Sequence, residues 1–330
     1  MKSKFRNIFF ILGVVAIVIM LLFTDMTYDD VHSCLRRAGI WFPVLLLLWM
    51  FIYVINAGAW YAIISNGLHG KKVPFWKVYK YTITGFALNS TTPVGLMGGE
   101  PYRIMELKPY VGIEKASSSV ILYVMMHIFS HFCFWLFSIM IYVLSYYNQM
   151  NRTYLIIMSV FLVACVIGIY FFIKGYRSGL VMKLMGFLQK LPFIKHKISG
   201  IMERKKETFI QIDDQIKDLY RNNKYTFCTS LFLEFIARVI SCLEVYFILM
   251  IFSAEASFFD SILILAFTSL FANLMFFSPM QLGAREGGFV MSVALLSIPY
   301  SYGVFMALLI RIREIVCVIL GIGLMKIGNK

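Results

Sequence analysis

Long apolar runs, separated by short polar or basic segments, make up most of the chain. Three of these runs, Trp41 to Ile64, Ala116 to Tyr147 and Thr153 to Ile173, contain no charged residue. At about 1.5 Å per residue, each run is long enough to cross a hydrocarbon core of roughly 30 Å as a helix. The pattern therefore predicts three membrane-spanning helices.

Three further apolar stretches are less uniform. Ile8 to Phe23 follows a basic start, as in a secretory signal peptide, but no small-residue cleavage site follows it, so we expect a retained first helix. Tyr225 to Ala254 and Gly303 to Met325 also have the length of spanning helices. Their charged residues must face protein or water. These residues are Glu234, Arg238, Glu244, Arg311, Arg313 and Glu314.

Two segments, Tyr81 to Gly99 and Ser261 to Ala284, are hydrophobic enough to enter the membrane but end in proline and glycine. We expect re-entrant or broken helices here. The first segment is also rich in threonine, serine and asparagine, a composition that suits a hydrated or protein-buried lining better than lipid contact.

Composition and charge agree with this pattern. Hydrophobic residues make up 60% of the chain and charged residues 15%, with a mean hydropathy of +0.78, which excludes a soluble protein. The net charge of +14 indicates basic loops at a negatively charged membrane surface, and we expect no nucleic-acid partner. The six cysteines are scattered, and we predict no disulfide framework, metal site or cofactor.

The segment from residue 174 to residue 224 contains twelve lysines and arginines against five acids. The excess predicts a cytoplasmic, basic, amphipathic connector, with both termini of the chain on the same side of a cell inner membrane. Arg36 and Arg37, in the first outer loop, disagree with this orientation. Apolar residues recur among the charges from Met202 to Leu219. We expect them to form a helix that lies on the inner membrane surface or docks a soluble enzyme.

A repeat relates the two interrupted segments. Pro93 to Glu100 matches Pro279 to Glu286, with seven residues from proline to glutamate in both. The spans that precede the two motifs are predicted to cross the membrane in opposite directions. We therefore predict one all-α, polytopic domain over residues 1–330, built from inverted repeats whose cores are 41–147 and 225–325 and which each contain a re-entrant or broken helix pair.

The motif residues suggest both the shape and the chemistry of the two turns. Glycines let a helix stop within the membrane, and Pro101 suits the first position of the next helix. Glutamates and arginines at such a turn can bind the head group of a lipid. Alternatively, they can pair with each other across the pseudo-two-fold axis that would relate the two repeats, and so hold the turns together. The predicted turn residues are Pro93, Gly95, Gly98, Gly99, Pro101, Pro279, Gly283 and Gly287. The predicted substrate-binding residues are Asn89, Glu100, Arg103, Glu234, Arg238, Arg285, Glu286, Arg311 and Glu314.

Other polar residues have simpler interpretations. Glu234 with Arg238, and Arg311 with Glu314, have helical spacings that also allow local ion pairs. His127 and His131 have the spacing of metal ligands but lack a third ligand, so we expect polar packing between helices. Asp213 and Asp214 lie in the basic connector, where we expect a solvated face. We find no catalytic fingerprint.

Asn89, the motif from Pro93 to Pro101 and the segment from Pro279 to Gly287 resemble the family of lysylphosphatidylglycerol synthase transmembrane regions, also described as flippase-like. The resemblance implies an inner-membrane protein that moves or accommodates a lipid, whether anionic, aminoacylated or polyprenyl-linked. Members that make lysyl-lipid carry a C-terminal soluble synthase domain, whereas the last predicted helix here ends close to Lys330. We therefore expect transport rather than aminoacyl transfer.

These observations lead to one preferred function and two alternatives. The preferred function is a lipid translocase with a polar groove between the repeats, in which arginines bind phosphate and glutamates bind cationic groups or protons. The first alternative is a membrane-embedded transferase that modifies lipid with the same carboxylates. The second is a non-catalytic membrane partner that recruits a cytoplasmic lipid-modifying enzyme to the connector.

Overall fold

The computed structural model contains helices and no strand in the part of the chain that it describes, which is residues 7–11, 14–15, 27–66, 73–91, 98–146, 152–179, 181–189, 195–252, 257–275, 281 and 283–327. The helices are α2 (Tyr28–Ala38), α3 (Trp41–Ser65), α4 (Phe75–Thr91), α5 (Gly99–Tyr146), α6 (Arg152–Ser178), α7 (Val181–Leu188), α8 (Lys195–Asn222), α9 (Lys224–Met250), α10 (Phe258–Leu274), α11 (Ala284–Leu295) and α12 (Tyr300–Leu324).

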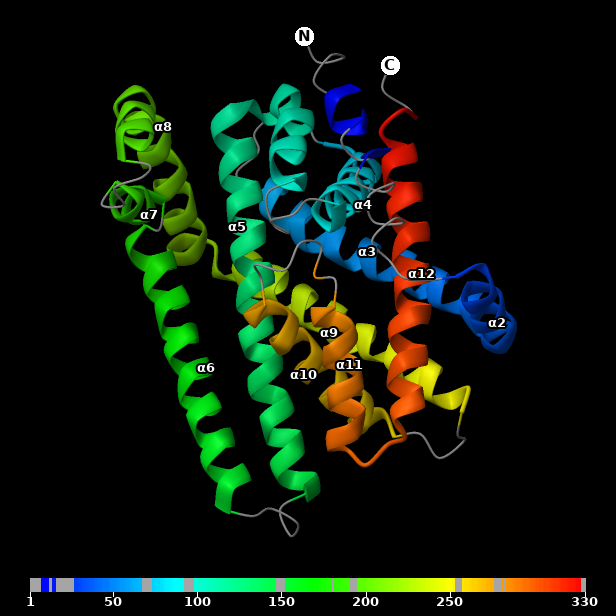
Figure 1. The fold of residues 1–330 in the computed structure, drawn as a ribbon. Coiled ribbons are helices and arrows are strands. Elements are labelled where there is room, and N and C mark those ends of the chain that lie inside the picture. The colour runs from blue at the N-terminus through cyan, green and yellow to red at the C-terminus, as the bar shows by residue number, and fades with distance from the viewer. Residues whose placement is uncertain are drawn as a thin grey trace.

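Long helices form the body of the molecule. In Figure 1, α5 and α6 run antiparallel along one side, α12 lies on the other, and α3 and α9 cross obliquely between them. The described residues nearest the two ends of the chain lie together, since the Lys326 Nζ donates to the Asn7 Oδ1 at 2.9 Å. The predicted first helix, Ile8 to Phe23, lies mostly outside the described residues.

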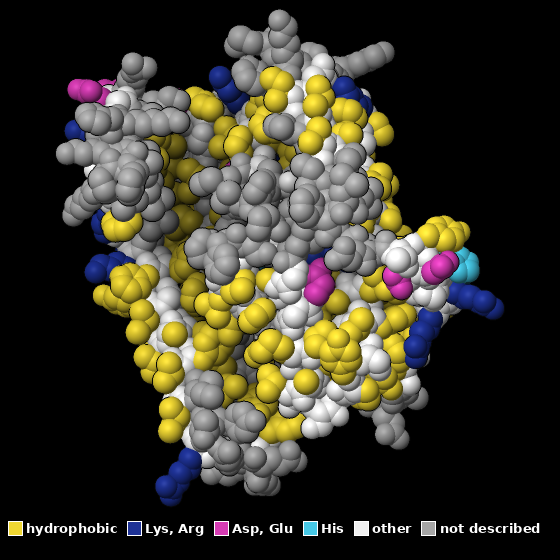
Figure 2. All heavy atoms as spheres, viewed as in Figure 1, with side chains coloured by type: hydrophobic (Ala, Val, Ile, Leu, Met, Phe, Trp, Pro, Cys, Tyr) yellow, Lys and Arg dark blue, Asp and Glu magenta, His cyan; other side chains and the backbone are white. Residues whose placement is uncertain are grey.

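Three described helices are long and apolar enough to cross a membrane: Trp41–Ser65, Gly99–Tyr146 and Met158–Ser178. On α6 the side chains of Ile156 and Val160 are each 65% exposed. Figure 2 shows hydrophobic side chains over much of the visible surface, including the outer edge formed by α6. Such a surface suits lipid rather than water. The charged helices α9 and α12 match these spans in length.

Helix α5 is two helices joined at Gly112. The glycine has φ 81° and ψ 169°, which breaks the helical path. A residue with a side chain is strained at this positive φ, so glycine is the residue that allows the chain to reverse here. The short helix that starts at Gly99 therefore ends at Gly112, and the long helix predicted from Ala116 begins beside it.

The two interrupted segments form helix pairs. In Figure 1, α4 and the first part of α5 lie in the upper half of the molecule, and α10 and α11 lie in the lower half. Helices α4 and α10 are both 17 residues long, and each begins a few residues before its predicted segment. Helix α5 begins at Gly99, so the structure places Pro101 at the third helical position rather than the first. The inverted repeat itself stays a prediction.

The connector differs from the surface helix that we expected. Ile212, Ile216 and Leu219 on α8 are buried in the protein core, so this apolar face packs on the protein. Asp213 is buried as well and not on a solvated face. Its carboxylate accepts hydrogen bonds from the backbone N–H groups of Val181 and Met182, both at 2.9 Å, and so caps the start of α7.

Helix α2 was not predicted from the sequence. It begins with a capping box, in which the Thr27 hydroxyl accepts from the Asp30 N–H at 3.2 Å and the Asp30 carboxylate accepts from the Thr27 N–H at 3.0 Å. The hydrogen bonds from Thr27 lower the pKa of Asp30. Arg37, at the other end of α2, lies 4.1 Å from the centre of the Phe252 ring, which ties the helix to the chain segment after α9.

Candidate functional site

The described end of the first motif takes part in a small polar cluster between α4 and α5. Asn89 on α4 donates from its Nδ2 to the Glu100 Oε1 at 2.9 Å and accepts from the Gly99 N–H at 2.7 Å. One turn further along α5, the Arg103 Nη2 donates to the backbone oxygen of Thr82 at 3.3 Å. We call Thr82, Asn89, Glu100 and Arg103 the first cluster. It lies at the N-terminus of a helix, where the helix dipole favours a negative charge.

Aromatic rings surround the Arg103 guanidinium. Its central carbon lies 4.9 Å from the centre of the Phe86 ring, 5.2 Å from Tyr123 and 5.6 Å from Trp60. A methyl group on Gly85 would overlap the guanidinium, so the absence of a side chain on this turn of α4 makes room for it. The arginine side chain is 1% exposed. The rings stabilise the cation without using its N–H donors.

Two buried polar groups of the first cluster, one on Arg103 and one on Glu100, have no hydrogen-bond partner among the described residues. The Arg103 Nη1 lies 3.7 Å from the Glu100 Oε1, which is an ion-pair distance but too long for a hydrogen bond. The Arg103 Nε and the Glu100 Oε2 are buried and have no hydrogen-bond partner in the described part of the chain. An arginine has five N–H donors, so this one has several available for an additional acceptor.

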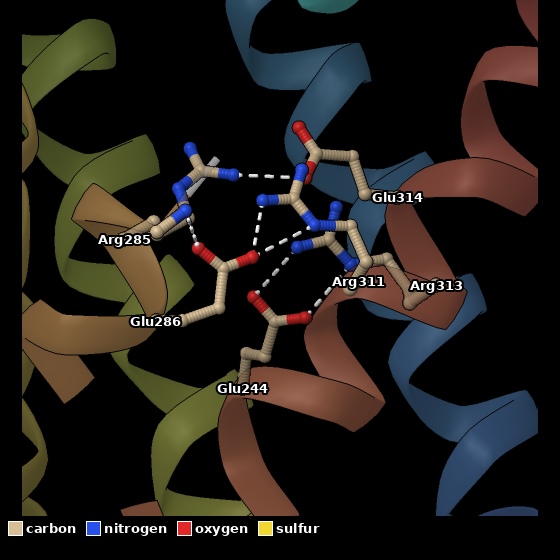
Figure 3. Close-up of polar contacts among 7 residues, drawn as sticks. Glu244, Arg285, Glu286, Arg311, Arg313 and Glu314 are labelled. Atoms are coloured by element: carbon tan, nitrogen blue, oxygen red, sulfur yellow. Dashed lines mark hydrogen bonds and ion pairs between the residues drawn. The ribbon is translucent and has the colours of Figure 1, made fainter. Parts of the chain in front are cut away.

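The second motif forms a cluster of a different kind with α12. The Arg285 Nη1 donates to the Glu314 Oε2 at 3.0 Å, and the Arg311 Nη1 donates to the same oxygen at 3.3 Å. Arg311 also donates to the Glu286 Oε1, from Nε at 3.0 Å and from Nη2. The other oxygen of Glu286 accepts from the Gly283 N–H at 2.9 Å. We call Arg285, Glu286, Arg311 and Glu314 the second cluster, which Figure 3 shows in close-up.

A bidentate ion pair lies next to the second cluster. Arg313 donates to both carboxylate oxygens of Glu244, from Nε at 2.8 Å and from Nη2 at 3.1 Å (Figure 3). Both side chains are almost fully buried, and the Arg313 guanidinium also lies 4.0 Å from the centre of the Trp49 ring. The pair joins α9 to α12 and satisfies both oxygens of the carboxylate.

A third polar group joins α5 to α9. The His127 Nδ1 and the Glu234 Oε2 share a hydrogen bond of 2.7 Å. Arg238 does not bond its neighbour Glu234. Instead it donates to the Ser130 Oγ at 2.7 Å and to the backbone oxygen of His127 at 2.9 Å. The His131 ring meets the His127 ring edge-on at 5.5 Å. We call His127 and Glu234 the interhelical pair.

The Phe86 ring connects these regions. It lies 4.9 Å from the Arg103 guanidinium, 5.8 Å from the His127 ring and 5.5 Å from the Tyr53 ring. Tyr53 in turn interacts electrostatically with Arg313. The three polar regions are therefore neighbours across one aromatic layer rather than separate sites.

The predicted site residues thus fall into three groups. In the described part of the chain, no ion pair joins Glu100 or Arg103 to the second cluster. The alternative in which the two motifs pair with each other therefore does not describe these side chains.

The predicted local pair of Arg311 with Glu314 is confirmed. Three predicted turn residues lie outside the described residues. They are Pro93, Gly95 and Pro279.

Several residues that complete the site were missing from the prediction. Thr82 contributes a backbone oxygen, which no side-chain pattern indicates. His127 and Ser130 lie on the face of α5 that meets α9, and only the contact between these helices selects them. Glu244 and Arg313 were visible as charges within spans, but 69 positions separate them in the sequence and no helical spacing relates them.

A cavity lies elsewhere, beside the connector. It has a volume of about 680 Å³ and is bounded by α3, α5 and α8, with Lys115, Asp214 and Asp218 among its charged lining residues. The described residues contain no group of three or more His, Cys, Asp or Glu side chains that could hold a metal ion.

The apolar helices and the ion pairs buried among them define a multi-pass helical membrane protein. The family model of the lysylphosphatidylglycerol synthase transmembrane region matches residues 8–321, and the chain belongs to this family. The resemblance carried by Asn89 and the two motifs is thereby confirmed, and family membership implies an association with membrane lipid. No curated protein and no solved structure matches the chain.

Proposed function

We propose that the protein is a lipid translocase that receives an anionic lipid head group at the first cluster. The observation that carries the proposal is Arg103, a fully buried arginine whose only described acceptor is one backbone oxygen. A buried guanidinium without full pairing is costly, and a phosphate that accepts two of its N–H groups would remove most of that cost. The acyl chains would remain in lipid.

The charges of the first cluster fit such a ligand. Glu100 is already held by Asn89, and its oxygen lies 3.7 Å from the Arg103 Nη1, so this carboxylate does not take up the N–H groups of the arginine by hydrogen bonding. The start of α5 adds backbone N–H groups and the positive end of the helix dipole. Glu100 itself offers the oxygen Oε2 to a cationic part of the head group, such as an amine.

The second cluster has another role in this proposal. Its arginines and glutamates already bind one another, so we assign it to holding α11 against α12. Arg285 and Glu286 are each 34% exposed, which places these two residues at the accessible edge of the cluster. Breaking and re-forming these ion pairs would let α11 move relative to α12.

We further propose that the halves containing the two clusters are inverted repeats, with the basic connector and both termini in the cytoplasm. The order of helix lengths supports the repeat. In the first half a long helix (α3) is followed by two shorter ones (α4 and the first part of α5) and another long one (the second part of α5). In the second half α9, α10, α11 and α12 follow the same order. A membrane-impermeant thiol reagent tests the topology. Applied to the outside of intact cells, it should leave the exposed Cys228, at the start of α9, unlabelled.

Reconstituted vesicles test the translocase. Purified protein should accelerate the transfer of head-group-labelled phosphatidylglycerol between leaflets, and Arg103→Gln should reduce the rate at least about tenfold, since a charged hydrogen bond contributes about 1.5–3 kcal/mol. Arg177→Gln, which changes an exposed arginine on α6, is the matched control and should keep the rate. Equal rates for wild type and Arg103→Gln, or a wild-type rate no faster than in protein-free vesicles, would contradict the proposal.

A further inference from the structure

The interhelical pair is a buried, titratable group that the proposed translocation does not use. His127 lies about 21 Å along the long part of α5 from its start beside Gly112, at about 1.5 Å per residue, and therefore deep within a predicted span. Its partner Glu234 is 1% exposed, whereas the His127 side chain is 26% exposed. The Glu234 carboxylate is thus buried in the protein, and of the two side chains only the His127 imidazole is accessible from outside.

Hydrogen bonding around the pair leaves capacity for a proton. The Glu234 Oε1 and the His131 Nδ1 are buried and have no hydrogen-bond partner among the residues described. Arg238, one turn from Glu234, donates to Ser130 and to a backbone oxygen and so does not neutralise the carboxylate by a direct hydrogen bond. Intramembrane carboxylates and histidines in this situation are typical of proton-binding sites.

Charges around the pair connect it to the first cluster. Arg103 and His127 lie on the same Phe86 ring, at 4.9 Å and 5.8 Å from its centre. The positive charge of Arg103 acts on His127 through this low-dielectric layer. The other charged or titratable groups that face the pair come from α5 and α9. Tyr123 and Arg238 interact with Glu234, and His131 interacts with His127. Cys133 and Cys242 lie one step further away, where they interact with Arg238.

We propose that the interhelical pair binds one proton together with each anionic head group at the first cluster, so that lipid and proton move as a coupled unit. This proposal rests on the proposed function. In the lipid-free state a neutral His127 donates its Nδ1 proton to the Glu234 carboxylate. A proton from water then adds to the Nε2 nitrogen, which gives an imidazolium, and the same proton leaves when the lipid leaves.

The sign of the coupling follows from electrostatics. A phosphate at Arg103 cancels the positive charge that opposes an imidazolium at His127, so lipid binding favours proton binding. Linkage requires the converse, namely that proton binding favours lipid binding by the same factor. The affinity for an anionic lipid should therefore rise as the pH falls through the range in which the pair titrates.

Proton uptake on lipid binding is the direct test. Phosphatidylglycerol added to the detergent-solubilised, weakly buffered full chain should cause uptake of up to one proton per protein, and its affinity should rise about fivefold or more between pH 8 and pH 6. Both effects should be lost in Glu234→Gln and in His127→Gln. They should remain in His32→Gln, which changes an exposed histidine on α2.

The outcomes separate this inference from the proposed function. Lipid binding without proton uptake, or uptake that persists in Glu234→Gln, overturns the proton coupling and leaves the translocase intact. If no lipid binds at all, the translocase fails, and a nitrogen-15 histidine titration of the lipid-free protein then decides the inference. The His127 signal should titrate with a midpoint that changes in Glu234→Gln, and a signal that does not titrate overturns the inference.

Discussion

The first and second clusters use the same residue types in opposite ways. In the second cluster each described carboxylate and guanidinium binds at least one oppositely charged side chain within about hydrogen-bond distance, and the neighbouring pair of Glu244 with Arg313 is bidentate. In the first cluster, Arg103 has one backbone acceptor and a carboxylate 3.7 Å away. On the proposed function, this difference assigns the second cluster to holding helices together and the first cluster to receiving a ligand.

Breaking the bidentate pair should have the largest effect on stability. Glu244→Gln leaves the Arg313 guanidinium buried without a counter-charge, which costs about 3–5 kcal/mol. Thermal unfolding in detergent measures the loss. Adding Arg313→Gln to this variant should recover part of the stability, because the buried charge is then absent, and a double variant as unstable as the single one would contradict the account.

Pushing α5 away from α4 should have the next largest effect on stability. A methyl group on Gly99 would overlap the carbonyl group of Gly85, so Gly99→Ala must push α5 away from α4. Such overpacking costs about 1–3 kcal/mol. Gly323→Ala is the control, since nothing lies within 4 Å of an added methyl group there, and its stability should equal or exceed that of the wild type. Equal stability for Gly99→Ala would disprove the close packing.

Removing one charge at the exposed edge of the second cluster should have a smaller effect. Glu286→Gln weakens the hydrogen bonds from Arg311, but the side chain is 34% exposed and water replaces part of the loss. We expect a loss of stability of about 1–2 kcal/mol in urea unfolding. The exposed Glu207→Gln on α8 should change the stability by less than about 0.5 kcal/mol. If Glu286→Gln lost as little stability as Glu207→Gln, Glu286 would not contribute to holding the second cluster together.

Changing the first cluster should have the smallest effect on stability. Arg103→Gln removes a buried charge that has few partners, so the thermal unfolding free energy should change by less than about 1 kcal/mol in lipid-free detergent. The rate of lipid translocation should nevertheless fall at least about tenfold, as described above. A large loss of stability without lipid would mean that Arg103 is structural, like Arg313.

Much of the fold follows from patterns within single helices. Charge-free runs predicted the spanning helices, and the proline and glycine motifs predicted where the helix pairs break. Helix α2 was missed because its eleven residues include four acidic or basic ones and few apolar ones, so its ends are defined by the Thr27 capping box rather than by hydrophobicity. The apolar face of α8 suited lipid and protein equally well, and only its contact with α5 decides between them.

The candidate site was predictable in its residue types but not in its pairings. The spacing of three residues correctly paired Arg311 with Glu314. The spacing of four residues predicted the wrong partner for Glu234, because His127 on α5 lies at 2.7 Å while Arg238 turns toward Ser130. Arg313 has two carboxylate acceptors, whereas Arg103 has one described backbone acceptor. This contrast depends on distances between helices, which cannot be read from residue spacing along the chain.

Photo-crosslinking tests the central claim most directly. A photo-reactive phenylalanine analogue at Phe86, beside Arg103, and another at Trp49, beside Arg313, place equivalent probes at the two kinds of arginine. In phosphatidylglycerol vesicles the probe at Phe86 should label lipid at least about tenfold more than the probe at Trp49, and Arg103→Gln should remove the excess. Equal labelling at both positions, or labelling at Phe86 that survives Arg103→Gln, would contradict the account.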